Sequence, residues 1–218
     1  MASDLDKDEI VLCLNYDGKF GLNNMNLYFQ NANTKSEVYT WAEWTFKVGD
    51  PVIFLDTQRS PLLYNNLKGR IVDISKRDSV ILFTLDIDTI LTERQCRNES
   101  FEFVDVTDFG TRIRLEVVAN DDELATEEER IKTIIPFQIA YAVSIHKAQG
   151  LEYNSVKIII PSYNAEKISH SIFYTAITRA KEKLKIFWSA ETMKTVVESF
   201  DKEKNGQRTL ELIEEKLK

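Results

Sequence analysis

The strongest constraint on the fold of this chain is a pair of apolar segments joined by a short polar connector. The pair lies within residues 140–160 and reads "AYAVSIHKAQGLEYNSVKIII". The outer segments, "AYAVSI" and "SVKIII", are rich in apolar and β-branched residues, which is typical of strands buried within a sheet. Residues 10–30 also indicate a strand, a turn and a helix, and this alternation predicts an α/β sheet.

The connector holds the polar side chains that could bind a ligand. Ser144 stands where the first predicted strand ends, so its side chain can cap a short helix and leave backbone N–H groups facing an anion. Gly150 allows the backbone to approach a ligand closely, and Glu152 offers an acceptor for a hydroxyl pair such as that of a ribose. The connector also carries His146, Lys147 and Gln149. For His146 the alternative is a core or capping role, and for Lys147 and Gln149 it is solvent exposure.

A second segment, residues 172–188, reads "IFYTAITRAKEKLKIFW". Its pattern predicts a helix followed by another buried strand, with Arg179 directly after Thr178 at the end of the helix. Arginine presents a fixed, charged fork of donors that suits a phosphate group. For an arbitrary arginine, pairing with a carboxylate would be the simpler interpretation.

Taken together, "SIHKAQGLEY" and "FYTAITRAKEKLKI" resemble motifs V and VI of superfamily 1 helicases of the UvrD/Rep and RecD-like type. The two segments stand in the expected order and at the expected spacing, which is more specific than a lone glycine pattern. The resemblance implies a RecA-like motor domain, with ATP in its cleft and single-stranded nucleic acid across its top.

The resemblance also implies roles for individual residues. Arg179 matches the residue that reaches the γ-phosphate as an arginine finger, so it is the predicted catalytic residue. Gly150 and Glu152 match contacts to the phosphate and the ribose of the nucleotide, and Gln149 is assigned to the same contact. The residues around the connector's start that are predicted to contact the DNA strand are Ser144, His146 and Lys147.

Residues 48–133 read as a β-rich insert of about five short strands, two of them with clear alternation of apolar and polar residues. Such a series predicts a small barrel. RecD-like helicases carry an SH3-like barrel at this place, so the resemblance implies one here. Asn66 and Gly69, in "YNNLKG", match its asparagine-glycine loop, and Asn66 is predicted to contact the DNA strand that the barrel guides.

The first 30 residues carry a weaker match to the same family. A "G…LN…Q" segment opens the second motor domain of RecD-like helicases, and its counterparts here are Gly21, Met25, Asn26 and Gln30. An ordinary strand and helix without any ligand contact is the alternative.

The predicted fold is therefore an α/β, RecA-like parallel sheet with helices, interrupted by a small SH3-like β-barrel. We expect the sheet to be formed by residues 1–47 and 134–218, and the barrel by residues 48–133. Two packing helices are expected near the end, one capped by Ser189 and one within residues 207–218.

Charge is distributed unevenly along the chain, whose net charge is −7. Residues 78–130 contain 15 acidic residues and five arginines, whereas residues 136–190 contain seven basic and three acidic residues. The net charge argues against a protein that coats nucleic acid nonspecifically, because such binding needs lysine and arginine to neutralise phosphates. Cys13 and Cys96 make no metal-ligand spacing with the two histidines, so we expect inert thiols and no metal site.

Half of a helicase ATP site is missing from the sequence. The first RecA-like domain would bring a "GxxxxGK[ST]" loop for the phosphates and an acidic residue for Mg²⁺, and the sequence contains no such loop. ATP and Mg²⁺ are thus expected only in a complete enzyme, with Mg²⁺ held by the missing half. That half would belong to the same parent chain or to a separate subunit. The third alternative is a non-catalytic nucleic-acid-binding module or regulatory subunit related to helicases.

The sequence has no apolar run of about 18 or more residues, the length that a membrane span requires. Its first residues, "MASDLDKDEI", lack the regions of a signal peptide. We therefore expect no membrane segment and a cytoplasmic location, with single-stranded DNA as the macromolecular ligand.

Overall fold

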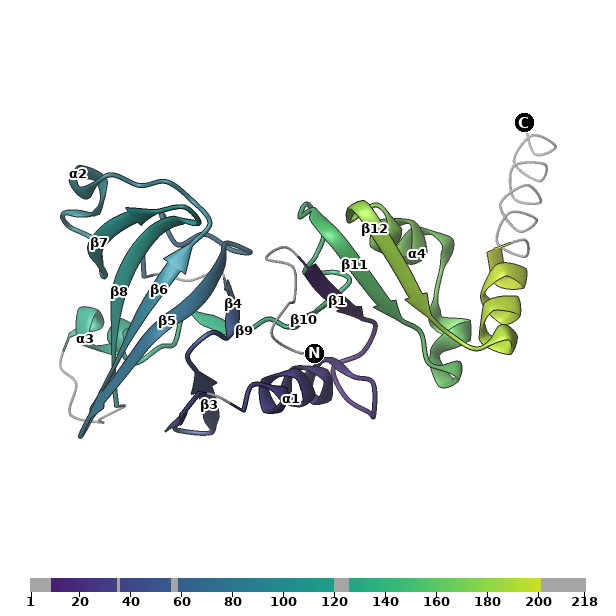
Figure 1. Ribbon diagram of the computed structural model, residues 1–218, viewed down its shortest axis with the longest axis horizontal. Coiled ribbons are helices and arrows are strands. Elements are labelled where there is room, and N and C mark those ends of the chain that lie inside the picture. Colours follow the sequence, from purple (N-terminus) through teal and green to yellow (C-terminus); the bar gives the residue numbers. More distant parts are fainter. Residues whose placement is uncertain (1–8, 35, 56–58, 120–125, 201–218) are drawn as a thin grey trace, which may run out of the picture. The chain divides into compact units, whose positions relative to one another are not determined.

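A computed structural model describes residues 9–34, 36–55, 59–119 and 126–200 (Figure 1). The chain divides into two compact units. Unit 1 comprises residues 1–25 and 142–218, and unit 2 comprises residues 26–141. The domain boundaries predicted from the sequence lie after residues 47 and 133, whereas the two units divide after residues 25 and 141. The predicted domain boundaries stay a prediction.

Unit 1 is built around a parallel sheet of four strands in the order β10-β1-β11-β12. The strands are β1 (Glu9–Cys13), β10 (Ala142–Ser144), β11 (Tyr153–Ile159) and β12 (Ala180–Phe187). Apolar side chains of β1 and β11 lie opposite one another and are almost fully buried, among them Leu12 and Ile158. The mixed α/β fold with a parallel sheet is thereby confirmed.

The described part of unit 1 contains four helical elements, and serine side chains cap two of them. The four elements are the start of α1 (Leu22–Ala32), the 3₁₀ helix η1 (Ser162–Lys167), α4 (His170–Ile177) and a helix over residues 190–200. The side chain of Ser169 accepts a hydrogen bond from the Ile172 N–H at 3.2 Å and so caps α4. Ser189 caps the next helix in the same way, through the Thr192 N–H at 3.0 Å, as predicted. The second predicted packing helix lies outside the described residues.

β12 differs from the sequence prediction of a buried strand. Among the residues that the structure describes, it pairs with β11 alone and so stands at the edge of the sheet, and most of its side chains are exposed. Leu184 and Phe187 keep 45% and 43% of their surface in solvent, so the apolar composition misled the prediction. Three lysines, Lys181, Lys183 and Lys185, alternate along the strand.

Unit 2 contains a six-stranded antiparallel sheet in the order β7-β8-β6-β5-β4-β9 and a separate hairpin of β2 and β3. The strands are β2 (Val38–Trp41), β3 (Trp44–Lys47), β4 (Pro51–Phe54), β5 (Lys68–Arg77), β6 (Val80–Ile87), β7 (Glu102–Thr107), β8 (Gly110–Val118) and β9 (Phe137–Ile139). Two short helices, α2 (Glu93–Cys96) and α3 (Glu127–Lys132), each begin with a threonine capping box.

The core of unit 2 is aromatic. Along β6, half-buried and fully buried side chains alternate strictly, as expected for a sheet with one face in the core. Phe83 is fully buried, and its ring meets those of Phe46 and Phe137 edge to face at 5.0 and 5.1 Å between centroids. These edge-to-face contacts join β3, β6 and β9 in one hydrophobic core.

The closed barrel predicted for the insert is not found. Over the described residues, β7 pairs with β8 and β9 pairs with β4, so the sheet has two open edges. Alternation in the sequence gives the strands and their buried face, but it does not tell whether the first and last strands meet. None of the helices in the described ranges is long and apolar enough to cross a membrane.

Candidate functional site

The connector begins where β10 ends, at Ser144, as the sequence predicted. The Ser144 side chain accepts a hydrogen bond from the Lys147 N–H at 3.3 Å, and its carbonyl accepts one from the Ala148 N–H at 3.1 Å. Two further turns follow, from Gln149 N–H to the His146 carbonyl and from Leu151 N–H to the Ala148 carbonyl. The predicted short helix is therefore wrong, because residues 145–150 form successive turns.

Burial divides the connector into anchors and a solvent-facing surface. Ile145 and Ala148 are buried, at 4% and 0% exposed, and hold the connector to unit 1. Most of the predicted ligand-binding residues of the connector are exposed, namely His146, Gln149, Gly150 and Glu152. Lys147 is half-buried, whereas Ser144, a predicted DNA contact, is buried at 2% exposed. Polar side chains are thus presented on a fixed backbone.

Gly150 has the left-handed backbone conformation, with φ at +85°. A Cβ added at this position would meet no heavy atom within 4 Å. Glycine is needed here for its backbone angle, and the space beside it is open to a ligand.

Arg179 follows α4 directly, and its half-buried guanidinium is oriented by three hydrogen bonds. Nε donates to the Thr175 carbonyl at 2.9 Å, and Nη2 donates to the Thr178 hydroxyl at 3.0 Å. Nη1 donates to the Leu151 carbonyl at 3.1 Å. Since Thr175 belongs to the last turn of α4, the positive charge also lies where a helix favours a cation.

The structure brings the connector and the Arg179 segment together at the start of β11 and β12. Besides the bond from Arg179 to Leu151, the Tyr153 N–H donates to the Arg179 carbonyl at 2.8 Å. Lys181 forms an ion pair with Glu152 at 3.5 Å between nitrogen and oxygen. The Arg179 segment is therefore bonded to the chain on both sides of Glu152, at Leu151 and at Tyr153.

Three residues of this junction were missed by sequence reasoning. Thr175 and Thr178 orient the guanidinium, and Lys181 pairs with Glu152. Arg179 Nε bonds to the backbone carbonyl of Thr175, one of the last carbonyls of α4, which have no partner within the helix. A basic residue directly after a helix could have predicted such a contact, whereas the pairing of Lys181 depends on β-strand register.

Asn66 belongs to unit 2, whereas the other predicted site residues belong to unit 1. It stands in the turn before β5 with φ at +69°, and its N–H donates to the Phe54 carbonyl at 2.9 Å. Asparagine tolerates this conformation better than most residues, which gives Asn66 a local structural role. Its contact with DNA stays a prediction.

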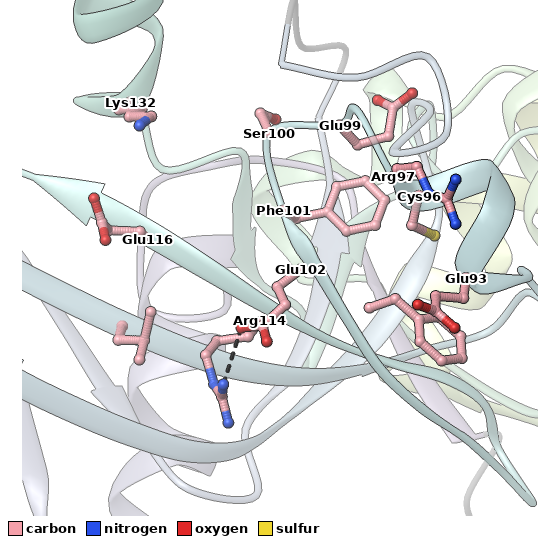
Figure 2. A pocket seen from close by; sticks show the side chains of 12 residues that line it. Glu93, Cys96, Arg97, Glu99, Ser100, Phe101, Glu102, Arg114, Glu116 and Lys132 are labelled. Atoms are coloured by element: carbon pink, nitrogen blue, oxygen red, sulfur yellow. Dashed lines mark hydrogen bonds and ion pairs between the residues drawn. The ribbon is translucent and has the colours of Figure 1, made fainter.

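A pocket of about 580 Å³ lies in unit 2, beside α2 and the start of β7 (Figure 2). Phe101 and Leu82 contribute apolar surface, and an ion pair of 2.9 Å joins Arg114 to Glu102 at its wall. None of the residues predicted from the sequence to bind nucleotide or DNA lines this pocket. It is thus separate from the candidate site.

Both thiols are free and buried. Burial raises the pKa of the Cys13 thiol to about 12, so the thiol is protonated at neutral pH. Among the residues whose placement is described, no group of three or more His, Cys, Asp or Glu side chains could hold a metal ion.

Residues 139–186, which include the whole junction, match the UvrD-like helicase C-terminal domain. This match falls on the segment that carries both motifs, and with the RecD relatives it supports the predicted resemblance to the C-terminal domain of a superfamily 1 helicase. Within that class it is similar to RecD. The RecBCD enzyme subunit RecD of Buchnera aphidicola subsp. Schizaphis graminum is 23% identical over 198 residues, covering 88% of this chain and 27% of that protein.

Two further similarities concern shorter or more distant matches. The ATP-dependent RecD2 DNA helicase of Deinococcus radiodurans is 31% identical over 81 residues, covering 37% of this chain and 10% of that protein. The Pif1 helicase from Bacteroides, in a crystal structure with ADP-AlF3 and ssDNA, gives a TM-score of 0.46 at 17% identity, covering 88% of this chain and 43% of that chain. The chain spans about a quarter of the length of the RecD proteins that it matches over most of its own length.

Proposed function

We propose that this chain is the second motor domain of an ATP-dependent DNA helicase or translocase. In this proposal it supplies half of the ATP site and part of the track for single-stranded DNA. The observation that carries the proposal is the junction at which the Arg179 guanidinium bonds to the Leu151 carbonyl, between Gly150 and Glu152. This hydrogen bond joins two segments that are 28 residues apart and that both carry predicted nucleotide-binding residues.

The geometry of Arg179 is suited to an arginine finger. Arginine has five N–H donors, and within the described part of the chain three of them are used to orient the side chain. One N–H on each terminal nitrogen is left for phosphate oxygens, and such a fork can bind them bidentately. A guanidinium held in place beforehand needs little reorganisation to stabilise the negative charge of a transferring phosphoryl group.

The residues around Arg179 fit a nucleotide. The open space at Gly150 admits a phosphate close to the backbone, and the exposed Glu152 carboxylate can accept hydrogen bonds from ribose hydroxyls. ATP would supply the phosphoryl group whose transfer drives the motor. Mg²⁺ would be held by the P-loop domain, the partner that completes the cleft, and not by residues of this chain.

For the DNA track we propose the connector. Ser144 fixes the first turn, and His146 and Lys147 follow it, one exposed and one half-buried. Unit 2 would be the counterpart of the SH3-like insert of RecD-like helicases, with Asn66 near the strand it guides. A motor of this kind would act on DNA in the cytoplasm.

A direct test uses two measurements. A fluorescent oligo-dT titrated with this chain should show binding that weakens steeply between 50 and 200 mM salt. ATP turnover by this chain alone should be undetectable, and turnover should appear only in a protein that also contains the P-loop domain. DNA-dependent turnover by the isolated chain would contradict the proposal, whereas DNA binding without turnover in the complete protein would favour a non-catalytic binding module.

A further inference from the structure

Unit 2 contains a buried polar cluster, which we call the Asp50 cluster and define as Gln30, Lys47, Asp50 and Tyr141. Asp50 is fully buried, and Gln30 and Lys47 are 5% and 7% exposed. The Asp50 carboxylate accepts hydrogen bonds from Gln30 Nε2 at 2.6 Å, from the Lys47 N–H at 2.8 Å and from the Tyr141 hydroxyl at 2.9 Å. A buried carboxylate is tolerated only when it is satisfied in this way.

Every other member of the cluster is also engaged. The Lys47 ammonium donates to the carbonyls of Gln30 and Asn33, at 3.0 and 2.8 Å, near the end of α1. Gln30 Nε2 also donates to the Thr45 carbonyl, and its own carbonyl oxygen accepts from the Thr45 hydroxyl. Burial raises the pKa of the Asp50 carboxyl, while its hydrogen-bond donors and the Lys47 charge act in the opposite direction.

The location of the cluster gives it a role beyond packing. The chain passes between the two units twice, within α1 after Met25 and again after Tyr141. Gln30 lies on α1, five residues beyond the first crossing, and Tyr141 is the last residue before the second. The Phe29 ring also stacks on the Tyr141 ring, at 6.2 Å between centroids. The ring contact of Phe29 and Tyr141 therefore links the two segments of unit 2 at which the chain passes to unit 1. The hydrogen bonds of Gln30 and Tyr141 to Asp50 link both segments to the rest of unit 2.

We propose that Asp50, Gln30 and Tyr141 are positioning residues for the connector. Ala142, the first residue of β10, follows Tyr141 directly, and Ser144 begins the connector two residues later. The hydrogen bond from Tyr141 to Asp50 fixes the point at which the chain enters β10. Holding that point limits the local opening of β10 and of the turns that carry His146 and Lys147.

Hydrogen exchange of Tyr141→Phe tests this inference, since the substitution removes the hydroxyl and retains the ring. A hydrogen bond to a charged group contributes enough that its loss should speed exchange of the hydrogen-bonded amides in residues 142–152 about tenfold or more. Exchange in β6, β8 and β12 should stay as in the wild type. The matched control is Tyr39→Phe, which removes an exposed hydroxyl that donates to Glu37 at 3.3 Å, and it should leave all amides unchanged.

Two results would overturn the inference. One is unchanged exchange in residues 142–152, and the other is an equal rise throughout unit 2, which would show a purely structural role. If Tyr141→Phe does not fold, Asp50→Asn is measured instead, because it preserves the volume and removes the charge. It should accelerate exchange in residues 26–32 and 142–152 together, and a rise confined to β4, β5 and β6 would refute the positioning role.

The link to DNA rests on the proposed function, and the same variants separate the two. Tyr141→Phe should weaken oligo-dT binding severalfold while Tyr39→Phe does not. If the wild type fails to bind oligo-dT, the proposed function fails, but the exchange pattern still decides whether Asp50 and Tyr141 position the connector.

Discussion

The two units of this protein use opposite ways of building a sheet, and the candidate functional residues follow that difference. In unit 1 all strands are parallel, so the chain must return between strands, and the polar residues of the candidate site stand on such a return. In unit 2 the strands are antiparallel, and several of its polar residues are buried, among them Arg59, Thr111 and the members of the Asp50 cluster. The connection between two parallel strands has backbone groups that are free to bind a ligand. The backbone groups of paired antiparallel strands are used in hydrogen bonds to one another.

Charge separates the units as well. Residues 26–141 contain 20 acidic and 13 basic residues, a net charge of −7, whereas the residues of unit 1 contain 15 of each. On the outer face of unit 2, arginines are matched by neighbouring carboxylates, as in the two bonds of 2.7 and 2.9 Å from Arg112 to Asp86. Unit 2 is thus poorly suited to neutralising phosphates, and we expect unit 1 to make most contacts with a nucleic acid.

The largest expected effect concerns the chemistry assigned to unit 1. In a protein that contains both motor domains, Arg179→Ala should lower ATP turnover about a thousandfold or more, because an arginine finger contributes that much. Steady-state ATPase measurements with saturating DNA check this. Lys167→Ala, an exposed lysine at the end of η1, is the control and should retain full turnover. Loss of less than about tenfold in Arg179→Ala would remove the finger from the mechanism.

The next effect should be confined to unit 2. Phe83→Ala removes a fully buried ring that packs against two other aromatic rings, and it should lower the free energy of unfolding of unit 2 by about 3–5 kcal/mol. Urea unfolding followed by hydrogen exchange should show faster exchange in β5, β6 and β8, with β1 and β11 nearly unchanged. Equal loss of protection in both units would mean that they unfold as one cooperative body.

A smaller effect compares the two predicted DNA contacts. Lys147→Ala should weaken oligo-dT binding severalfold and flatten its salt dependence by roughly one phosphate contact. Asn66→Ala, in the acidic unit, should change the salt dependence little because no charge is removed. The measurement is fluorescence anisotropy at several salt concentrations, and the reverse ranking would place the DNA track on unit 2.

The smallest effect is expected at the ion pair between Lys181 and Glu152. Both side chains are at least half exposed, so Lys181→Ala should change the free energy of unfolding by less than about 1 kcal/mol. Thermal unfolding of the variant beside the wild type checks this. A loss of several kcal/mol would show that the junction is held mainly by this pair and not by the hydrogen bonds of Arg179.

The sequence was most informative where local pattern and chemistry coincide. The end of β10 at Ser144, the exposed polar residues after it, and Arg179 at the end of a helix could all be predicted from composition and order. The exposure of β12 could not, because its apolar residues are the same whether a strand is central or at an edge. The short helix expected after Ser144 failed because capping by Ser144 is compatible with a turn as well.

The contacts that the sequence did not reveal join residues that are far apart. Gln30 and Asp50 are 20 positions apart, and Tyr141 and Asp50 are 91 positions apart. Nothing in the local pattern around Asp50 distinguishes a buried carboxylate from the surface aspartate of an ordinary turn. Likewise, whether the strands of the insert close into a barrel depends on the pairing of its first and last strands, which alternation does not encode.

The edge position of β12 has a consequence for how copies of this protein behave in solution. An open strand edge can pair with the same edge of another molecule, which is a common route to aggregation. Here such a pairing would bring Lys181, Lys183 and Lys185 of one copy against those of the other. Repulsion between these lysines should oppose self-association at low ionic strength. At 1 M salt the Debye length is only about 3 Å, so this repulsion is screened. We therefore expect high salt to favour aggregation of the protein.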